Sequence, residues 1–247
     1  MNKSIEKFAI LGERCSGTNF LEETMLKNFD ITYTSEYGHK HFFCHNNYDN
    51  REKTDSTLFI GIVRNPIYWL NSFSKELYHL PEINRKNLYN FLFNEFYSVH
   101  DGIRSKNTFK SPNSNVNKDD LNLNGQKYKN IFEMRKVKNN FLINTMHLKV
   151  KNYILINYED LLFNFEVVMK NIKEKFNLNQ KLPSFQKEKK YKKSPNYNFV
   201  KQREISFTPQ VINLIWNYLN LEQEKYLGYL PFNNNNLFKN KYTNLKS

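Results

Sequence analysis

The sequence has little cysteine and no long apolar run. Two cysteines occur among the 247 residues, Cys15 and Cys44, and they form neither a CxxC pair nor a cluster of metal ligands. Neither a disulfide framework nor a structural zinc site is therefore indicated. A membrane-spanning helix needs about 18 consecutive apolar residues, which occur nowhere, and the first residues lack the apolar core of a signal peptide. We expect a cytoplasmic protein without a transmembrane segment.

Negative charge is also scarce, because 37 Lys and Arg face 24 Asp and Glu and leave a formal net charge of +13. A positive surface attracts polyanions such as nucleotides, nucleic acids, acidic glycans and anionic lipid headgroups, which leaves peripheral contact with a membrane open. The alternative is a solvated surface without a single partner, since Lys and Asn are abundant throughout. The composition gives no indication of an oligomeric state.

Segments of strand and helix character alternate along the chain. The sequence is 39% hydrophobic and 16% aromatic, which suffices for one domain; we place it at 1–232, followed by a polar tail at 233–247. The predicted strands and helices are, in order, strand 7–11, a helix after the loop at 12–17, strand 57–63, a helix from Pro66, helices 86–97 and 130–147, strand 152–158, and helices 165–176 and 208–228. Residues 104–128 read as a surface loop. This alternation predicts an α/β fold with a mostly parallel central sheet flanked by helices.

The stretch "GERCSGTNF" follows the first predicted strand and leads into a helix. Gly12 and Gly17 have the spacing of a phosphate-binding loop, but Thr18 and Asn19 stand where a nucleotide triphosphatase carries Lys and Ser or Thr. A ligand without a β,γ-phosphate pair and without a need for magnesium therefore fits better than ATP. The alternative is a tight strand-to-helix turn with no ligand.

Several groups of this loop suit an oxyanion. The N–H groups of residues 15–19 start a helix and carry the positive end of its dipole, Ser16 and Thr18 have hydroxyls, and Arg14 has a forked cation. Cys15 at a helix start could be a nucleophile. A tyrosine-phosphatase loop needs Arg six positions later, where Leu21 stands, so we assign Cys15 as a small loop residue.

A second candidate anion site lies in "GIVRNPIYWLNSFSK". Arg64 directly follows the strand at 57–63, Ser72 comes two helical turns later, and Lys75 follows it. Ligands bind at the carboxyl ends of strands in open α/β sheets, and both Arg64 and the 12–20 loop come at such ends. Two anion sites on one edge predict a ligand with two separated anionic groups.

Together, "GERCSGTNFLE" and "VRNPIYWLNSFSK" resemble the two nucleotide-binding motifs of sulfotransferases that use 3′-phosphoadenosine 5′-phosphosulfate (PAPS). The resemblance implies a P-loop-like architecture in which Arg64 and Ser72, eight residues apart, bind the 3′-phosphate. The cofactor-binding residues of the first loop would be Arg14, Cys15, Ser16, Gly17, Thr18, Asn19 and Phe20, of which 15–19 would hold the 5′ end of the nucleotide. The C-terminal helices resemble bacterial carbohydrate-type members, which implies a carbohydrate hydroxyl as acceptor and adenosine 3′,5′-bisphosphate as product.

At two positions of the loop, the residue has an alternative role or departs from the family's pattern. Phe20 sits where the family stacks an aromatic ring on adenine, and core packing is its alternative role. Soluble sulfotransferases carry Lys where this chain has Cys15, so the cation available is Arg14. Arg is a fixed charge rather than a tunable proton donor, and we assign Arg14 to charge stabilisation.

Candidate catalytic residues occur in "GHKHFF". Sulfuryl transfer needs a base for the acceptor hydroxyl and fixed positive charge on the transferred oxygens, and it needs no metal. The family often places a histidine base and a lysine in this region, which points to His41 as base and Lys40 on the sulfuryl group. His39 is the alternative base. His79 is a lesser candidate with a structural alternative.

The basic stretch at 187–203 resembles, by position only, the third nucleotide-contacting segment of the family. Lys193 or Lys201 would close on the 3′-phosphate or receive an acidic acceptor, and a solvated face is the alternative. Two other functions stay open: a magnesium-dependent P-loop phosphoryl transferase, and a non-catalytic, basic nucleic-acid-binding protein. No RNA-binding signature is present, so we expect no nucleic-acid partner.

Overall fold

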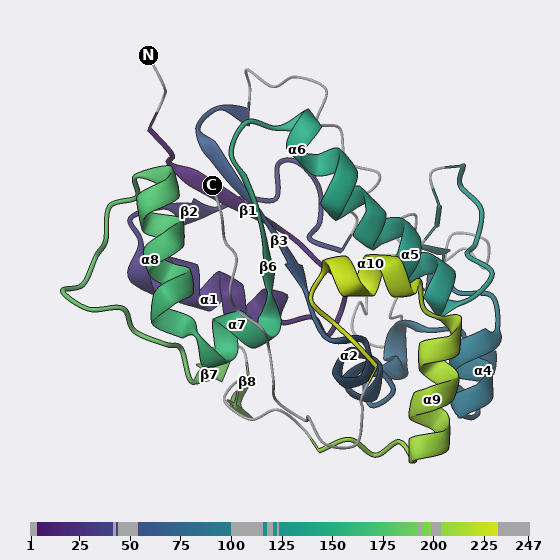
Figure 1. Ribbon diagram of the computed structural model, residues 1–247. Helices are drawn as coiled ribbons and strands as arrows, with labels where there is room; N and C mark the ends of the chain where they lie inside the picture. The colour runs from purple at the N-terminus through teal and green to yellow at the C-terminus, as the bar shows by residue number, and fades with distance from the viewer. Residues whose placement is uncertain are drawn as a thin grey trace.

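Four parallel strands in the order β2-β1-β3-β6 form the central sheet of the computed structural model (Figure 1). The structure describes residues 4–41, 43, 54–99, 116–117, 121–122, 124–191, 194–198 and 204–231. The strands are β1 (Lys7–Leu11), β2 (Thr32–Tyr33), β3 (Thr57–Val63) and β6 (Tyr153–Asn157). The predicted α/β class is therefore confirmed, whereas the P-loop-like sulfotransferase architecture stays a prediction.

Strand β3 lies at the centre of the sheet because its run "TLFIGIV" is apolar on both faces. All seven residues are buried, as expected for a strand covered on both sides. Its pairing sets Ile60 opposite Ile10 of β1 and opposite Ile154 of β6. The carboxyl ends of β1 and β3 therefore lie side by side, which brings together the segments that follow them.

Helices pack on both faces of the sheet. On one face, α1 (Thr18–Asn28), α7 (Tyr158–Phe163) and α8 (Phe165–Phe176) bury residues such as Met25 and Met169 against Ile60. On the other face lie α2 (Pro66–Phe73), α4 (Leu88–Phe93), α5 (Ile131–Asn140) and α9 (Pro209–Tyr218), packed around Phe59 and Trp69 (Figure 1). Successive residues of β3 point to opposite faces, so this one strand contributes to both cores.

The remaining elements are short. They are η3 (Leu77–His79), α3 (Glu82–Arg85), β4 (Ser98–Val99), β5 (Val116–Asn117), η5 (Phe141–Thr145), α6 (Met146–Lys149), β7 (Lys190–Tyr191), β8 (Ser194–Asn198) and α10 (Leu221–Tyr226). The predicted helix 130–147 is α5 continued through η5, a π-helical turn, into α6. The predicted helix 86–97 is shorter than expected, since α4 ends at Phe93 and Phe96 bridges to Tyr128.

Parts of the predicted organisation lie outside the described residues. The polar tail at 233–247 is one, and most of the predicted surface loop at 104–128 is another, although its described residues Val116 and Asn117 form β5, paired with β4. The domain limits 1–232 and 233–247 stay a prediction. Among the described residues, no helix has the length and apolar character needed to cross a membrane.

Candidate functional site

The loop between β1 and α1 contains two residues in a left-handed backbone conformation, and only one of them is a glycine. Cys15 and Gly17 both have positive φ values, 63° and 98°, in the left-handed region that favours glycine. A Cβ atom on Gly17 would lie 2.2 Å from Cδ2 of Tyr158, because the tyrosine ring packs directly against the backbone of Gly17. Glycine is therefore required at position 17 for conformation and for space.

Three successive carbonyl groups of this loop accept hydrogen bonds from the protein. Glu13 O accepts from Ser16 N at 3.1 Å and from Ser16 Oγ at 2.6 Å. Arg14 O accepts from Trp69 Nε1 at 2.9 Å, and Cys15 O accepts from Arg64 Nη1 at 2.9 Å. With their carbonyls held inward, the loop residues leave the N–H groups at the start of α1 as the polar groups available at this end of the helix.

The first turn of α1 has no side-chain cap. Its N-cap residue is Gly17, which has no side chain to accept from the first N–H groups. A helix start without a cap keeps free donors and the positive end of the helix dipole. The start of α1 thus lies within the 15–19 stretch for which the sequence predicts an oxyanion, and binding of that oxyanion stays a prediction.

Arg64 is in direct contact with this loop. It follows β3, is only 6% exposed, and its guanidinium both bonds Cys15 O and lies 4.6 Å over the ring of Tyr158. The predicted meeting of Arg64 with the loop at one edge of the sheet is thus present. Within the described part of the chain, the buried Nε of Arg64 has no hydrogen-bond partner. A buried cation with an unused donor can take an anionic oxygen.

Ser72 is buried on α2, at 4% exposure, and Lys75 beyond it is exposed. No hydrogen bond joins Ser72 to Arg64 among the residues that the structure describes. The neighbouring Asn71 binds the segment after the basic stretch: its Nδ2 donates to Glu204 O (2.9 Å), and its Oδ1 accepts from Ser206 N (2.9 Å) and Oγ (2.7 Å). The described residues that follow the basic stretch thus contact the helix that carries Ser72.

The start of the basic stretch lies on the opposite side of the sheet edge. Lys187 donates to Leu162 O of α7, and Glu188 accepts from Lys27 of α1 at 3.1 Å. The described residues on either side of this stretch therefore contact different helices: Lys187 and Glu188 contact α7 and α1, whereas Glu204 and Ser206 contact α2. Lys193 and Lys201 lie outside the described residues.

His41 lies against the first residue of the loop. Its Nδ1 is 2.7 Å from Gly12 O; since a carbonyl only accepts, Nδ1 carries the proton and Nε2 is left as the acceptor. Burial and then the charge of Arg14 hold the pKa of His41 well below its usual value. The imidazole is therefore neutral at neutral pH. His39 is exposed, with its ring 5.0 Å from that of His41.

Lys40 lies at the rim of the loop, but it is paired. Its ammonium donates to Asn19 Oδ1 (2.5 Å) and to Glu22 Oε2 (2.9 Å) in the first turns of α1. Its charge is balanced by Glu22, a residue that the motif gave no reason to select. Lys40 orders Asn19 and the start of α1 in addition to any role toward a ligand.

Burial and bonding give Phe20 and the Ser16 hydroxyl partners within the protein. Phe20 is 1% exposed and packs edge-on against Tyr158 at 6.1 Å between ring centroids, which fits its alternative role in the core; stacking on adenine stays a prediction. The Ser16 hydroxyl is buried and donates to Glu13 O at 2.6 Å, so it closes the loop rather than donating to a ligand. His79 is buried against Phe73 and Tyr78, which fits its structural alternative.

Five buried charged residues in and behind the loop were assigned no role by the sequence interpretation. Lys138 pairs with Glu13, and Arg135 pairs with Glu224. A third carboxylate, Glu159, accepts from Asn65 N at 3.0 Å and from the Tyr229 hydroxyl at 2.9 Å; burial raises its pKa. These groups hold the two anion-binding segments from within.

Searches against models of known protein families and against curated proteins find no match for this chain. In the described part of the chain, no three His, Cys, Asp or Glu side chains gather in a way that could hold a metal ion. What the site can do therefore follows from the residues themselves: an uncapped helix start, a buried arginine and a neutral histidine around one loop.

Proposed function

We propose that the protein is a sulfotransferase that moves a sulfuryl group from PAPS to a hydroxyl group, in the first instance that of a carbohydrate. The observation that carries the proposal is the direct contact between Arg64 and the 12–20 loop, with Nη1 of Arg64 2.9 Å from Cys15 O. Two anion-binding elements on adjacent strands suit a nucleotide with separated anionic groups.

The residues present fit the two ends of such a nucleotide. The N–H groups from Gly17 to Asn19 would hold the 5′ end, since the N-cap residue Gly17 has no side chain to accept from them. The 3′-phosphate would take the unused Nε of Arg64, near the helix of Ser72 and the end of the basic stretch. Lys193 and Lys201 of that stretch stay candidates for the same phosphate.

The loop favours a metal-independent nucleotide over a nucleoside triphosphate. A triphosphatase loop uses Lys to reach the β and γ phosphates and the next hydroxyl to hold magnesium, and Thr18 and Asn19 occupy those positions. Thr18 is buried at 4% exposure, and Asn19 is bonded to Lys40. Neither can replace the lysine.

His41 would act as the base. The donor supplies a sulfuryl group on a phosphate leaving group. The acceptor hydroxyl gives its proton to Nε2 of His41 while its oxygen bonds to sulfur, and the bond from sulfur to the phosphate oxygen breaks, leaving adenosine 3′,5′-bisphosphate. A neutral imidazole held by Gly12 O is in the correct form for this step. Arg14 would supply positive charge beside the transferred group, and Lys40 would have to turn from Glu22 and Asn19 to add to it.

Calorimetric titration with adenosine 3′,5′-bisphosphate in the presence of a magnesium chelator tests the proposal. We expect the wild type to bind and Arg64→Ala to lose about 2 kcal/mol, or roughly 30-fold in affinity, because a charged contact is removed. Lys170→Ala, which removes an exposed cation of α8, is the matched control and should bind as the wild type does. Equal binding by Arg64→Ala would overturn the assignment of the 3′-phosphate.

The two alternative functions give different results in the same titration. A magnesium-dependent phosphoryl transferase would bind ATP with magnesium and lose binding with the chelator. A nucleic-acid-binding protein would bind RNA with an affinity that falls steeply with salt and would ignore the bisphosphate. Either result would replace the sulfotransferase assignment.

A further inference from the structure

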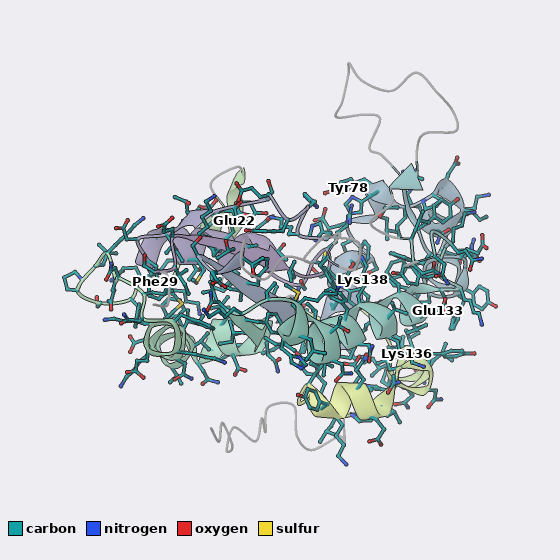
Figure 2. The ribbon with its side chains drawn as sticks, turned by 90° about the horizontal axis from the view of Figure 1, so that it is seen from above. Glu22, Phe29, Tyr78, Glu133, Lys136 and Lys138 are labelled. Carbon is teal, nitrogen blue, oxygen red and sulfur yellow. The ribbon has the colours of Figure 1, made fainter. Side chains whose placement is uncertain are left out.

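Two buried cations lie three residues apart on α5. Arg135 is 4% exposed and Lys138 is fully buried, and their spacing puts them on the same face of the helix. In Figure 2, Lys138 lies toward the centre of the molecule, whereas Lys136 of the same helix lies near its surface. Buried charges need partners because desolvation is costly, and the partners of these two cations are informative.

Lys138 joins the first loop to the segment of the base. Its ammonium donates to the carboxylate of Glu13 and, at 3.0 Å, to the carbonyl of His41. Glu13 is the residue after Gly12, and its backbone carbonyl accepts the hydrogen bond from the Ser16 hydroxyl. One ammonium group thus fixes the entry of the anion-binding loop and the backbone of the proposed base.

Arg135 holds the second anion-binding segment. Its Nη2 donates to Arg64 O at 3.0 Å, and Nε and Nη2 form a forked pair with Glu224 of α10 at 2.6 and 2.8 Å. Its guanidinium also lies 5.0 Å over the ring of Trp69, which donates to Arg14 O. Arg135 therefore fixes the backbone of Arg64 directly, whereas its link to the loop is a ring contact with Trp69, whose bond to Arg14 O is made by the indole itself.

We infer that Lys138 and Arg135 are positioning residues that set the two halves of the nucleotide site separately. Lys138 sets the 5′ half and His41, and Arg135 sets the 3′ half. The names of the two halves rest on the proposed function; the segments that each residue holds do not. A buried ion pair is seldom more stabilising than a well-packed apolar pair, so a geometric role explains these residues better than stability does.

Binding of three nucleotides separates the two roles. The variants are Lys138→Met with Glu13→Gln and Arg135→Met with Glu224→Gln, which remove both charges of each pair; Lys136→Met is the control on the same helix. For the first variant we expect affinity for adenosine 3′,5′-bisphosphate and adenosine 5′-phosphate to fall about tenfold or more, and that for adenosine 3′-phosphate to stay unchanged. The second variant should show the converse pattern, with the 5′-phosphate unaffected. Lys136→Met should bind all three as the wild type does.

Amide hydrogen exchange without ligand supplies a readout that does not depend on the nucleotide. Exchange should become faster at residues 12–20 in the first variant and at 64–73 in the second, each without the other. Equal loss of all three ligands together with faster exchange throughout would overturn the inference, because it would mark a general loss of stability.

The two possible failures are distinguishable. If the wild type binds none of the nucleotides, the proposed function is wrong, and the exchange pattern alone decides the inference: local changes support it and uniform changes overturn it. If a charge-neutral variant does not fold, Lys138→Arg and Arg135→Lys keep the charge and change the geometry. They should then give the same two local patterns, and wild-type exchange and binding in both would overturn the inference.

Discussion

The two strand-to-helix turns that meet at the edge of the sheet have opposite constructions. After β1, the helix begins at Gly17, which has φ of 98° and no side-chain cap. After β3, Asn65 accepts from Ile67 N and Tyr68 N, and Pro66 has no N–H to satisfy. Within the part of the chain that the structure describes, the first turn has no N-cap side chain for its backbone donors, whereas the second supplies one from Asn65.

Because of this difference, the two turns can offer a ligand different kinds of hydrogen-bond donor. The uncapped turn can offer N–H groups to a ligand, because nothing in the loop replaces the cap. The capped turn has no N–H groups to offer, so its contribution is the guanidinium of Arg64. One nucleotide would thus be held by backbone at one end and by side chains at the other.

The largest expected effect comes from removing the open backbone of the first turn. Gly17→Ala places a Cβ against the Tyr158 ring, 2.2 Å from Cδ2, at φ of 98°. The loop must move, and we expect affinity for adenosine 3′,5′-bisphosphate to fall about 100-fold or more, equivalent to roughly 3 kcal/mol. Calorimetry measures the affinity, and thermal unfolding measures the accompanying loss of stability.

Gly125→Ala is a matched control for this substitution. Gly125 also has positive φ, 74°, but a Cβ there meets nothing within 4 Å. It should show only the cost of the left-handed conformation, about 1–2 kcal/mol of stability, and bind the nucleotide as the wild type does. Similar binding losses in both variants would mean that the loop at 12–20 is not the binding element.

A smaller effect is expected from removing the cap of the second turn. Asn65→Ala deletes the side chain that accepts from Ile67 N at 3.0 Å and Tyr68 N at 3.4 Å. Stability should fall by about 1 kcal/mol, measured by denaturant unfolding, while Asn65→Asp should restore most of it. If Asn65→Ala is neutral, α2 does not depend on its cap, and the proposed contrast between the two turns is weaker than we describe.

The smallest expected effect is a displaced pH profile. The proposed reaction needs neutral His41, so the rate falls as the pH drops through its pKa, which burial and then the Arg14 charge hold well below the usual value. Arg14→Gln removes a cation that disfavours the imidazolium. The pKa then rises, and the acidic limb of the rate profile moves to higher pH.

The position of the limb, rather than the height of the profile, is the informative measurement, because Arg14 is also assigned to charge stabilisation. Lys151→Gln removes a cation that pairs with Asp55, away from the loop, and should leave the limb in place. A limb that stays put in Arg14→Gln would remove His41 from the role of base.

Local patterns in the sequence are sufficient to predict the strands that carry this site and the contact between Arg64 and the loop. The apolar runs gave β1 and β3, and the rule that parallel strands end at one edge predicted that Arg64 meets the loop, as its bond to Cys15 O now bears out. The same patterns could not separate core packing from stacking at Phe20, because a buried aromatic and a ligand-facing aromatic leave the same helical spacing.

The buried ion pairs were missed for a different reason. Glu13 and Lys138 are 125 positions apart, and no periodicity links residues at that distance. One signal was present: position 138 lies four residues from Met134 and from Leu142, on the side of the predicted helix that was read as apolar. A lysine within such a stripe indicates a buried charge that needs a partner.

The hydroxyl of Tyr229 has a consequence for how the chain is synthesised. It donates to Glu159, which accepts from Asn65 N, so the turn of Arg64 is completed by a residue near the end of the described chain. A nascent chain on the ribosome has the strands for its sheet long before Tyr229 emerges from the exit tunnel. If the chain binds a nucleotide as proposed, we expect binding to begin only after the segment with Tyr229 has docked, so that a truncated product has the sheet but not the completed turn of Arg64.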